Sequence, residues 1–77
     1  MDMIINLNRE PKYSLYNIGS IIIKQLKDSK NMDIGVLYSK IRLEIDQNLH
    51  IDFLYYALDW LYMLSIIEID ENRVVLC

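Results

Sequence analysis

Cysteine, histidine and proline are almost missing from this chain of 77 residues, which contains one of each. A single cysteine, Cys77, cannot form an internal disulfide, and one cysteine with one histidine cannot supply the ligand cluster that a structural zinc ion needs. The sequence therefore excludes a disulfide scaffold and a zinc domain. The same scarcity of cysteine favours a cytoplasmic protein.

Groups for catalysis and for phosphate binding are equally scarce. The only histidine, His50, lies where a helix is expected to begin, which favours a cap or a solvated side chain over a general base. Gly19 and Gly35 stand alone inside helical patterns, where they permit close helix packing but form no phosphate-binding loop. Asp52 and Asp59 are two helical turns apart, about 10 Å, too far to share a proton or to enclose a metal ion. We therefore expect that the protein is not an enzyme and that it has no catalytic residue, no cofactor and no metal site.

Long hydrophobic runs are also missing. A membrane span needs roughly 18 uninterrupted apolar residues, and even the most apolar stretch, Phe53–Leu64, contains Asp59. The first residues, MDMIINLN, have neither the basic start nor the long apolar centre of a secretory signal. We expect no contact with a membrane.

Positive charge is lacking in the second half of the chain. The sequence has 8 Lys and Arg against 11 Asp and Glu, a net charge of -3. No Lys or Arg lies between Arg42 and Arg73, a stretch that holds seven acidic residues: Glu44, Asp46, Asp52, Asp59, Glu68, Asp70 and Glu71. Such a chain is poorly suited to binding phosphate backbones. The acidic stretch fits either a solvated surface or a surface that meets a basic partner.

Apolar residues recur at separations of three and four, which predicts helices. The first helix follows Pro11 or a Ser14 cap, and the second follows an Asp33 cap. The polar residues 28–31 and 46–48 are expected to end them. Their core positions are predicted to be Leu15, Ile18, Ile22 and Leu26 in the first helix, and Ile34, Leu37, Ile41 and Ile45 in the second.

A third helix is expected over Ile51–Leu64. Its core stripe is predicted to contain Leu54, Leu58 and Leu61, together with Ala57 and Leu64. Trp60 is expected to pack in the core as well.

A two-residue alternation replaces the helical period after the third helix. Ile67 and Ile69 alternate with acidic residues, and residues 74–76 resume the apolar pattern, which predicts a hairpin over residues 66–77. Asn72 is expected to adopt the left-handed conformation in the turn.

The order of three helices and a hairpin predicts an α+β fold, a single winged-helix domain over residues 1–77. Residues 31–33 are placed where a short third strand would complete the sheet, and residues 1–10 are expected to be extended. A three-helix bundle with a disordered tail is the alternative fold, although the alternation and the β-branched residues of the tail argue against disorder.

The outer face of the third helix carries no side chain that reads DNA. A DNA-binding winged helix needs Lys, Arg, Asn or Gln there. At helical spacing this face instead holds Asp52, Tyr55, Tyr56, Asp59, Tyr62 and Met63. Tyrosine and methionine are frequent at the centres of protein interfaces. The sequence therefore predicts a partner-binding site at Tyr55, Tyr56, Asp59, Tyr62 and Met63, with core packing of single tyrosines as the alternative.

Three stretches of the chain resemble one known family: YSLYNIGSIIIKQL, DIGVLYSKIR and IDFLYYALDWLYMLSIIEIDENRVV. They are similar to the short middle-component proteins of bacterial ABC-three-component defence systems, and most nearly to the group designated middle component six. The resemblance runs from about Pro11 to Val75 and is most specific in ALDWLY, residues 57–62. Similar sequences tend to have glycine just after the third helix, where this chain has Ser65, which leaves open how that helix ends.

The resemblance implies a function that composition alone does not show. It implies a non-enzymatic winged-helix adaptor that bridges or regulates an SMC/Rad50-like ABC ATPase and an effector protein in an anti-phage or anti-plasmid defence complex. It brings no catalytic residues and no direct sequence-specific binding of nucleic acid. Dimerisation of the isolated chain through a free sheet edge stays open.

A DNA-binding function is the alternative. The chain would then be a homodimeric winged-helix transcriptional regulator that contacts DNA outside the third helix, through Lys24, Lys27, Lys30, Lys40 and Arg42. This alternative predicts binding to DNA that weakens as salt rises.

Overall fold

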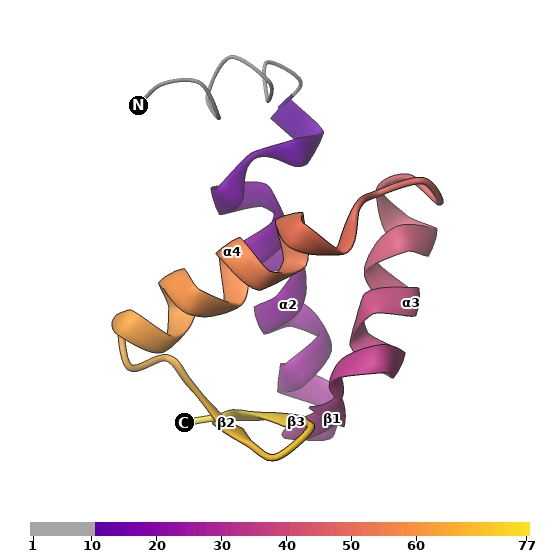
Figure 1. Ribbon diagram of the computed structural model, residues 1–77. Helices are drawn as coiled ribbons and strands as arrows, with labels where there is room; N and C mark the ends of the chain where they lie inside the picture. Colours follow the sequence, from indigo (N-terminus) through magenta and orange to yellow (C-terminus); the bar gives the residue numbers. More distant parts are fainter. Residues whose placement is uncertain (1–10) are drawn as a thin grey trace.

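Three helices and a small sheet make up residues 11–77, which are the residues that the computed structural model describes. The elements are η1 (Pro11–Tyr13), α2 (Leu15–Ser29), β1 (Asn31–Asp33), α3 (Ile34–Glu44), α4 (Ile51–Met63), β2 (Ile67–Asp70) and β3 (Arg73–Leu76). The three α-helices pack with a small antiparallel sheet, whose hairpin of β2 and β3 follows the last helix (Figure 1), which confirms the predicted α+β winged-helix layout. The extended segment predicted at residues 1–10 lies outside the described residues.

Side-chain caps begin all three helices. The Ser14 hydroxyl accepts a hydrogen bond from an N–H of the first turn of α2, so Ser14 rather than Pro11 caps this helix. The Asp33 carboxylate accepts from two N–H groups at the start of α3. His50 Nδ1 accepts from the N–H of Asp52, at 3.1 Å. Each cap satisfies an N–H that has no partner inside the helix, and the caps predicted at Asp33 and His50 are confirmed.

The first helix is longer than predicted. Asp28 and Ser29 belong to the last turn of α2, which ends at Lys30 with a φ of 71°. The Lys30 N–H donates to the Leu26 carbonyl at 2.7 Å. The predicted end before residue 28 is therefore wrong, because exposed polar residues can complete a turn as long as the backbone hydrogen bonds continue.

The core lies between α2, α3, α4 and the sheet, and α2 contacts each of them. Its buried residues are Ile18, Ile21, Ile22, Leu26, Met32, Leu37, Ile41, Leu49, Leu54, Ala57, Leu58, Leu61, Ile67 and Val74. The predicted stripe of α4 is confirmed except at Leu64, which is 52% exposed. Leu64 follows the last helical residue and takes the C-cap conformation, so the helical period no longer decides which way its side chain points.

The sheet has three antiparallel strands in the order β1-β3-β2. Met32 of β1 pairs with Val74 of β3, and Val74 pairs on its other side with Ile69 of β2. The short third strand predicted at residues 31–33 is confirmed, and a three-helix bundle with a disordered tail is excluded. The sheet lies at one end of the helices, below α2 and α3 in Figure 1.

A serine closes α4 in the conformation that usually belongs to glycine. Ser65 has a φ of 62°. Its N–H donates to the Tyr62 carbonyl at 2.9 Å, and the N–H of Ile66 donates to the Leu61 carbonyl at 3.0 Å. This pair of bonds is the Schellman motif. The helix therefore ends as it would with glycine, although Ser65 bears the steric cost of its Cβ.

The left-handed residue of the hairpin is Glu71, with a φ of 57°, so the prediction for Asn72 is wrong. A positive φ at the first of the two turn residues alone is the pattern of a type II′ turn. Asn72 instead makes two contacts with the start of α3. Its carbonyl accepts a hydrogen bond from the Ile34 N–H at 2.9 Å, and its side-chain amide lies 3.4 Å from the Asp33 carboxylate. These contacts join the turn to the start of α3, which no local sequence pattern reveals.

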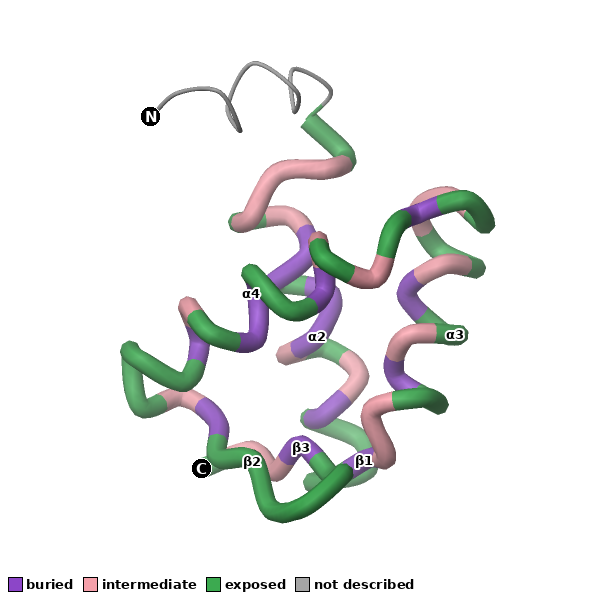
Figure 2. Tube along the Cα trace, viewed as in Figure 1, coloured by how far each residue is buried: buried purple, intermediate pink, exposed green. Residues whose placement is uncertain are grey.

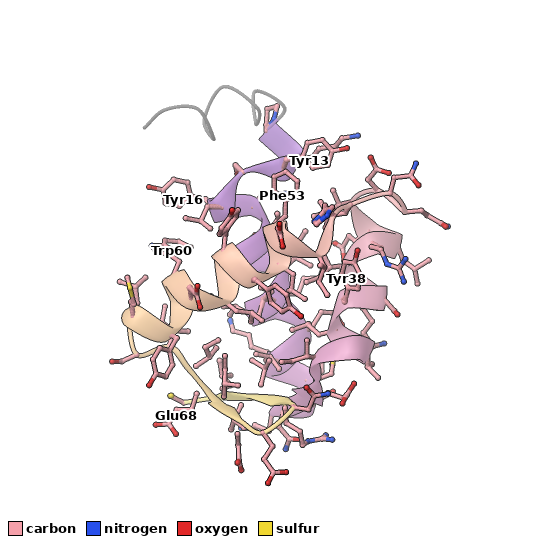
Figure 3. The ribbon with its side chains drawn as sticks, in the orientation of Figure 1. Tyr13, Tyr16, Tyr38, Phe53, Trp60 and Glu68 are labelled. Atoms are coloured by element: carbon pink, nitrogen blue, oxygen red, sulfur yellow. The ribbon has the colours of Figure 1, made fainter. Side chains whose placement is uncertain are left out.

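Gly19 allows α2 and α4 to approach closely. A Cβ at this position would lie 2.8 Å from Trp60 Cζ3. Trp60 itself is half-buried, packs against the core and meets the Tyr16 ring edge-on, with centroids 5.1 Å apart (Figure 3). The expected packing role of Gly19 is confirmed, whereas Gly35 is exposed in the first turn of α3 and packs against no helix.

Candidate protein-interaction surface

One side of α4 exposes aromatic side chains to solvent. Asp52, Tyr55, Tyr56, Asp59, Tyr62 and Met63 are all exposed, and we call these six residues the α4 face. The exposed fractions of its four large side chains run from 45% at Tyr55 to 74% at Met63. The opposite side of the helix carries the buried residues Leu54, Ala57, Leu58 and Leu61, so the two sides of α4 differ clearly (Figure 2). The structure thus brings the predicted site residues together on one surface.

Contacts at both ends of α4 hold this face in place. Near the start of the helix, the Phe53 ring stacks on Tyr13 with centroids 5.5 Å apart. Near its end, Trp60 meets Tyr16 on α2, and the Schellman motif at Ser65 fixes the last turn. Figure 3 shows these two aromatic pairs, formed by α4 with η1 and with the first turn of α2. The exposed tyrosines therefore stand on a helix that is anchored along its length, which lowers the entropic cost of binding a partner.

The charge of the α4 face is negative. Asp52 lies 3.6 Å from His50 Nδ1, and Asp59 has no ion pair with any residue that the structure describes. The helix contains no Lys or Arg. Two carboxylates in this position repel a phosphate backbone and attract a basic surface.

Two further apolar residues, Leu64 and Ile69, are exposed outside the predicted set. Leu64 follows Met63 directly, and Ile69 of β2 is 41% exposed. The helical period assigned Leu64 to the core, and the strand pattern did not reveal how little covers Ile69. The nearby Ser65, at a position that favours glycine, is the only local signal that the helical period stops there.

The basic residues of the DNA-binding alternative do not form one free patch. Lys24 of α2 forms an ion pair with Glu44 of α3 at 2.9 Å. The Arg42 guanidinium lies over the Tyr38 ring, 4.5 Å from its centroid. The other three residues of the set, Lys27, Lys30 and Lys40, are exposed. The DNA-binding alternative therefore depends mainly on these three lysines and stays a prediction.

Tyr13 and Asp46 connect η1, just before α2, to the loop after α3, a contact that the sequence did not predict. The Tyr13 hydroxyl donates a hydrogen bond to Asp46 Oδ2, and the Asn48 N–H donates to Asp46 Oδ1 at 2.9 Å. The bond from Tyr13, followed by the bond from Asn48, lowers the pKa of the Asp46 carboxyl below its ordinary value of 3.8. The two residues lie 33 positions apart, which places the contact beyond any local pattern.

Replacing Asp46 with asparagine should make the stability of the protein less dependent on pH in the acidic range. A lowered pKa in the folded state means that the carboxylate contributes stability above its unfolded pKa, and this contribution is lost as pH falls through the folded pKa. The difference in urea midpoint between wild type and Asp46→Asn should therefore be largest near neutral pH and shrink below pH 3.8. Tyr13→Phe is a companion variant, because it removes the same hydrogen bond from the other side and keeps the ring on Phe53. It should reduce the dependence of stability on pH in the same direction. Two profiles that run parallel to wild type would contradict this account.

Within residues 11–77, no group of three or more His, Cys, Asp and Glu side chains could hold a metal ion. None of the helices described there is long and apolar enough to cross a membrane.

A comparison with protein families identifies the chain. The model of the ABC-three component (ABC-3C) system Middle Component 6 family matches residues 5–77. Searches of curated proteins and of solved structures gave no significant match. Because the match leaves out only the first four residues, the chain belongs to the Middle Component 6 family of ABC-three component systems.

Proposed function

We propose that this protein is a non-enzymatic adaptor in a bacterial defence complex directed against phages or plasmids. It bridges or regulates an SMC/Rad50-like ABC ATPase and an effector protein. Membership of a middle-component family supports this role, because a middle component of a multi-component system has protein partners. The proposal attributes the contact with at least one of these partners to the α4 face.

The observation that carries the proposal is the exposure of Tyr55, Tyr56, Tyr62 and Met63 on one side of one helix. Tyrosine residues often contribute most of the binding energy at protein interfaces, since they bury a large ring and retain a polar hydroxyl. In a winged helix this face is the one that would enter the major groove of DNA. Here it presents rings and carboxylates, which suit a protein surface.

Charge specifies the kind of surface that the α4 face would meet. Asp52 and Asp59 lie at the same side of the helix as the tyrosines. A partner with Arg or Lys around an apolar centre would pair with both carboxylates and could stack guanidinium groups on the tyrosine rings. We therefore expect binding to weaken as salt rises, mainly through a slower association rate.

The double variant Tyr55→Ala with Tyr56→Ala should lose the complex. Each side chain is about half exposed, so the fold should remain while binding to the co-expressed ATPase and effector weakens by about tenfold or more, the loss expected when a tyrosine hot spot is truncated. Pull-down and size-exclusion mass measurement would quantify the loss.

Val36→Ala with Leu43→Ala is the matched control. Both side chains are exposed apolar residues on α3, at 48% and 75%, and lie outside the α4 face. This variant should bind as wild type does. Unchanged binding by the tyrosine variant would overturn the proposal.

A further inference from the structure

β2 is an edge strand, and no other strand of residues 11–77 covers its outer side. The hydrogen bond from the Cys77 N–H to the Ile66 carbonyl, at 2.9 Å, fixes the phase of its pairing with β3. In an antiparallel pair, every second residue directs both backbone groups to the partner strand. The Ile66 carbonyl and the backbone groups of Glu68 and Asp70 therefore face β3 and the residue that follows it, whereas the N–H and C=O groups of Ile67 and Ile69 point away from it.

The two faces of β2 have different chemistry. Ile67 and Ile69 lie on the face of β2 that is directed toward the core. Ile67 is buried and Ile69 is 41% exposed, so part of this apolar face is open to solvent. Glu68 and Asp70 lie on the other side and are exposed. In Figure 3, Glu68 projects from the strand at the border of the molecule.

The acidic side chains of β2 are not neutralised by the residues that the structure describes. The ion pairs of residues 11–77 involve neither Glu68 nor Asp70. Arg73 is the residue paired with Asp70 across the hairpin, but its guanidinium donates to the Asn31 side chain at 2.7 and 2.9 Å. The strand thus offers free backbone groups and unpaired negative charge at one edge.

We propose that the β2 edge, defined as Ile67 to Asp70, binds a strand of a partner protein in which Lys or Arg alternates with apolar residues. The added strand would bond to the N–H and C=O groups of Ile67 and Ile69. Its basic side chains would lie beside Glu68 and Asp70, and its apolar side chains would cover Ile69.

A second copy of β2 is a poor occupant of this edge. In the second copy, the residues whose backbone groups face outward would again be Ile67 and Ile69. Hydrogen bonding between the two copies would therefore place isoleucine opposite isoleucine. Glu68 and Asp70 of one copy would then lie beside the acidic residues of the other, and like charges on neighbouring strands are destabilising. Acidic side chains on an edge strand prevent self-pairing while they leave the edge open to a basic strand.

This inference goes beyond the proposed function, because it assigns a second surface that is separate from the α4 face. An adaptor between two larger proteins needs two surfaces that can be occupied together. The β2 edge uses backbone groups and alternating charge, whereas the α4 face uses aromatic side chains, so each can be disabled without changing the other.

The test uses the full chain and a short synthetic peptide of alternating lysine and valine. A control peptide has the same residues grouped in a lysine block and a valine block, so its total charge is equal. We expect the alternating peptide to bind about tenfold more tightly than the control. At saturation, amide hydrogen exchange should slow about tenfold at Ile67 and Ile69, and much less at Glu68 and Asp70, which already bond to β3.

Three variants locate the peptide. Glu68→Lys with Asp70→Lys should lose binding about tenfold, whereas Asp52→Lys with Asp59→Lys, which reverses the same charge on the α4 face, should retain it. Ile69→Pro removes one outward N–H without removing a bond to β3 and should also lose binding. The charge-reversal pair keeps the test valid if the proline variant does not fold.

Three results would overturn the inference. Equal binding of the two peptides would show that charge alone attracts them. Loss of binding only in the variant of Asp52 and Asp59 would place the peptide on α4. A dimer of the free chain that Ile69→Pro converts to monomer would show that a second copy occupies the edge.

Discussion

Gly19→Leu is expected to destabilise the protein by about 3 kcal/mol, because the added side chain overpacks a close contact between two helices. A Cβ at Gly19 would already lie 2.8 Å from Trp60 Cζ3 and 3.3 Å from Cε3, and leucine adds three further carbon atoms in the same direction. The gain in helix propensity on replacing glycine is about 1 kcal/mol and does not offset this overlap. The helices α2 and α4 would have to separate, which exposes the core between them. Urea unfolding followed by circular dichroism would measure the loss.

Two controls separate the overlap from other effects of leucine on α2. Ser20→Leu places the same side chain on the next residue, which is exposed, and should change stability by less than about 0.5 kcal/mol. Gly19→Leu should cost less in a Trp60→Ala background than in wild type, because the ring that the leucine meets is then absent. A Gly19→Leu variant with the urea midpoint of wild type would contradict the close approach of the helices.

Leu61→Ala should cost about 2–5 kcal/mol, whereas Leu64→Ala, three residues later, should cost less than about 1 kcal/mol. Leu61 is 1% exposed and its truncation leaves a cavity in the core. Leu64 is 52% exposed, so solvent or a partner fills the space of its side chain. The sequence assigns both residues to the same stripe, and the two variants therefore test the structure against the pattern. Equal losses in thermal unfolding would show that α4 continues past Met63.

Features with local causes could be predicted from the sequence. The three helices follow from apolar residues at separations of three and four, and the caps at Ser14, Asp33 and His50 follow from side chains that can accept an N–H bond. The exposure of the α4 face also follows from the period, because a helix that buries Leu54 and Leu58 on one side must turn Tyr55 and Tyr62 outward.

Features set by contacts between distant residues could not be predicted. The bond between Tyr13 and Asp46 joins two segments whose separation in sequence gives no signal. Glu71 rather than Asn72 is left-handed, since the Asn72 carbonyl is held by the N–H of Ile34. The free edge of β2 depends on strand order, which a list of predicted strands does not contain.

Lys30, Ser65 and Glu71 have a positive φ without being glycine, and all three lie where the chain enters or reverses at the sheet. Each such residue with a Cβ costs roughly 1 kcal/mol in local conformational energy. The free energy of unfolding is therefore lower than it would be with glycine at these three positions. Glycine substitutions there would recover part of this free energy and leave the core and the α4 face intact. The connections around the sheet are thus a suitable place to engineer a more stable form of the protein.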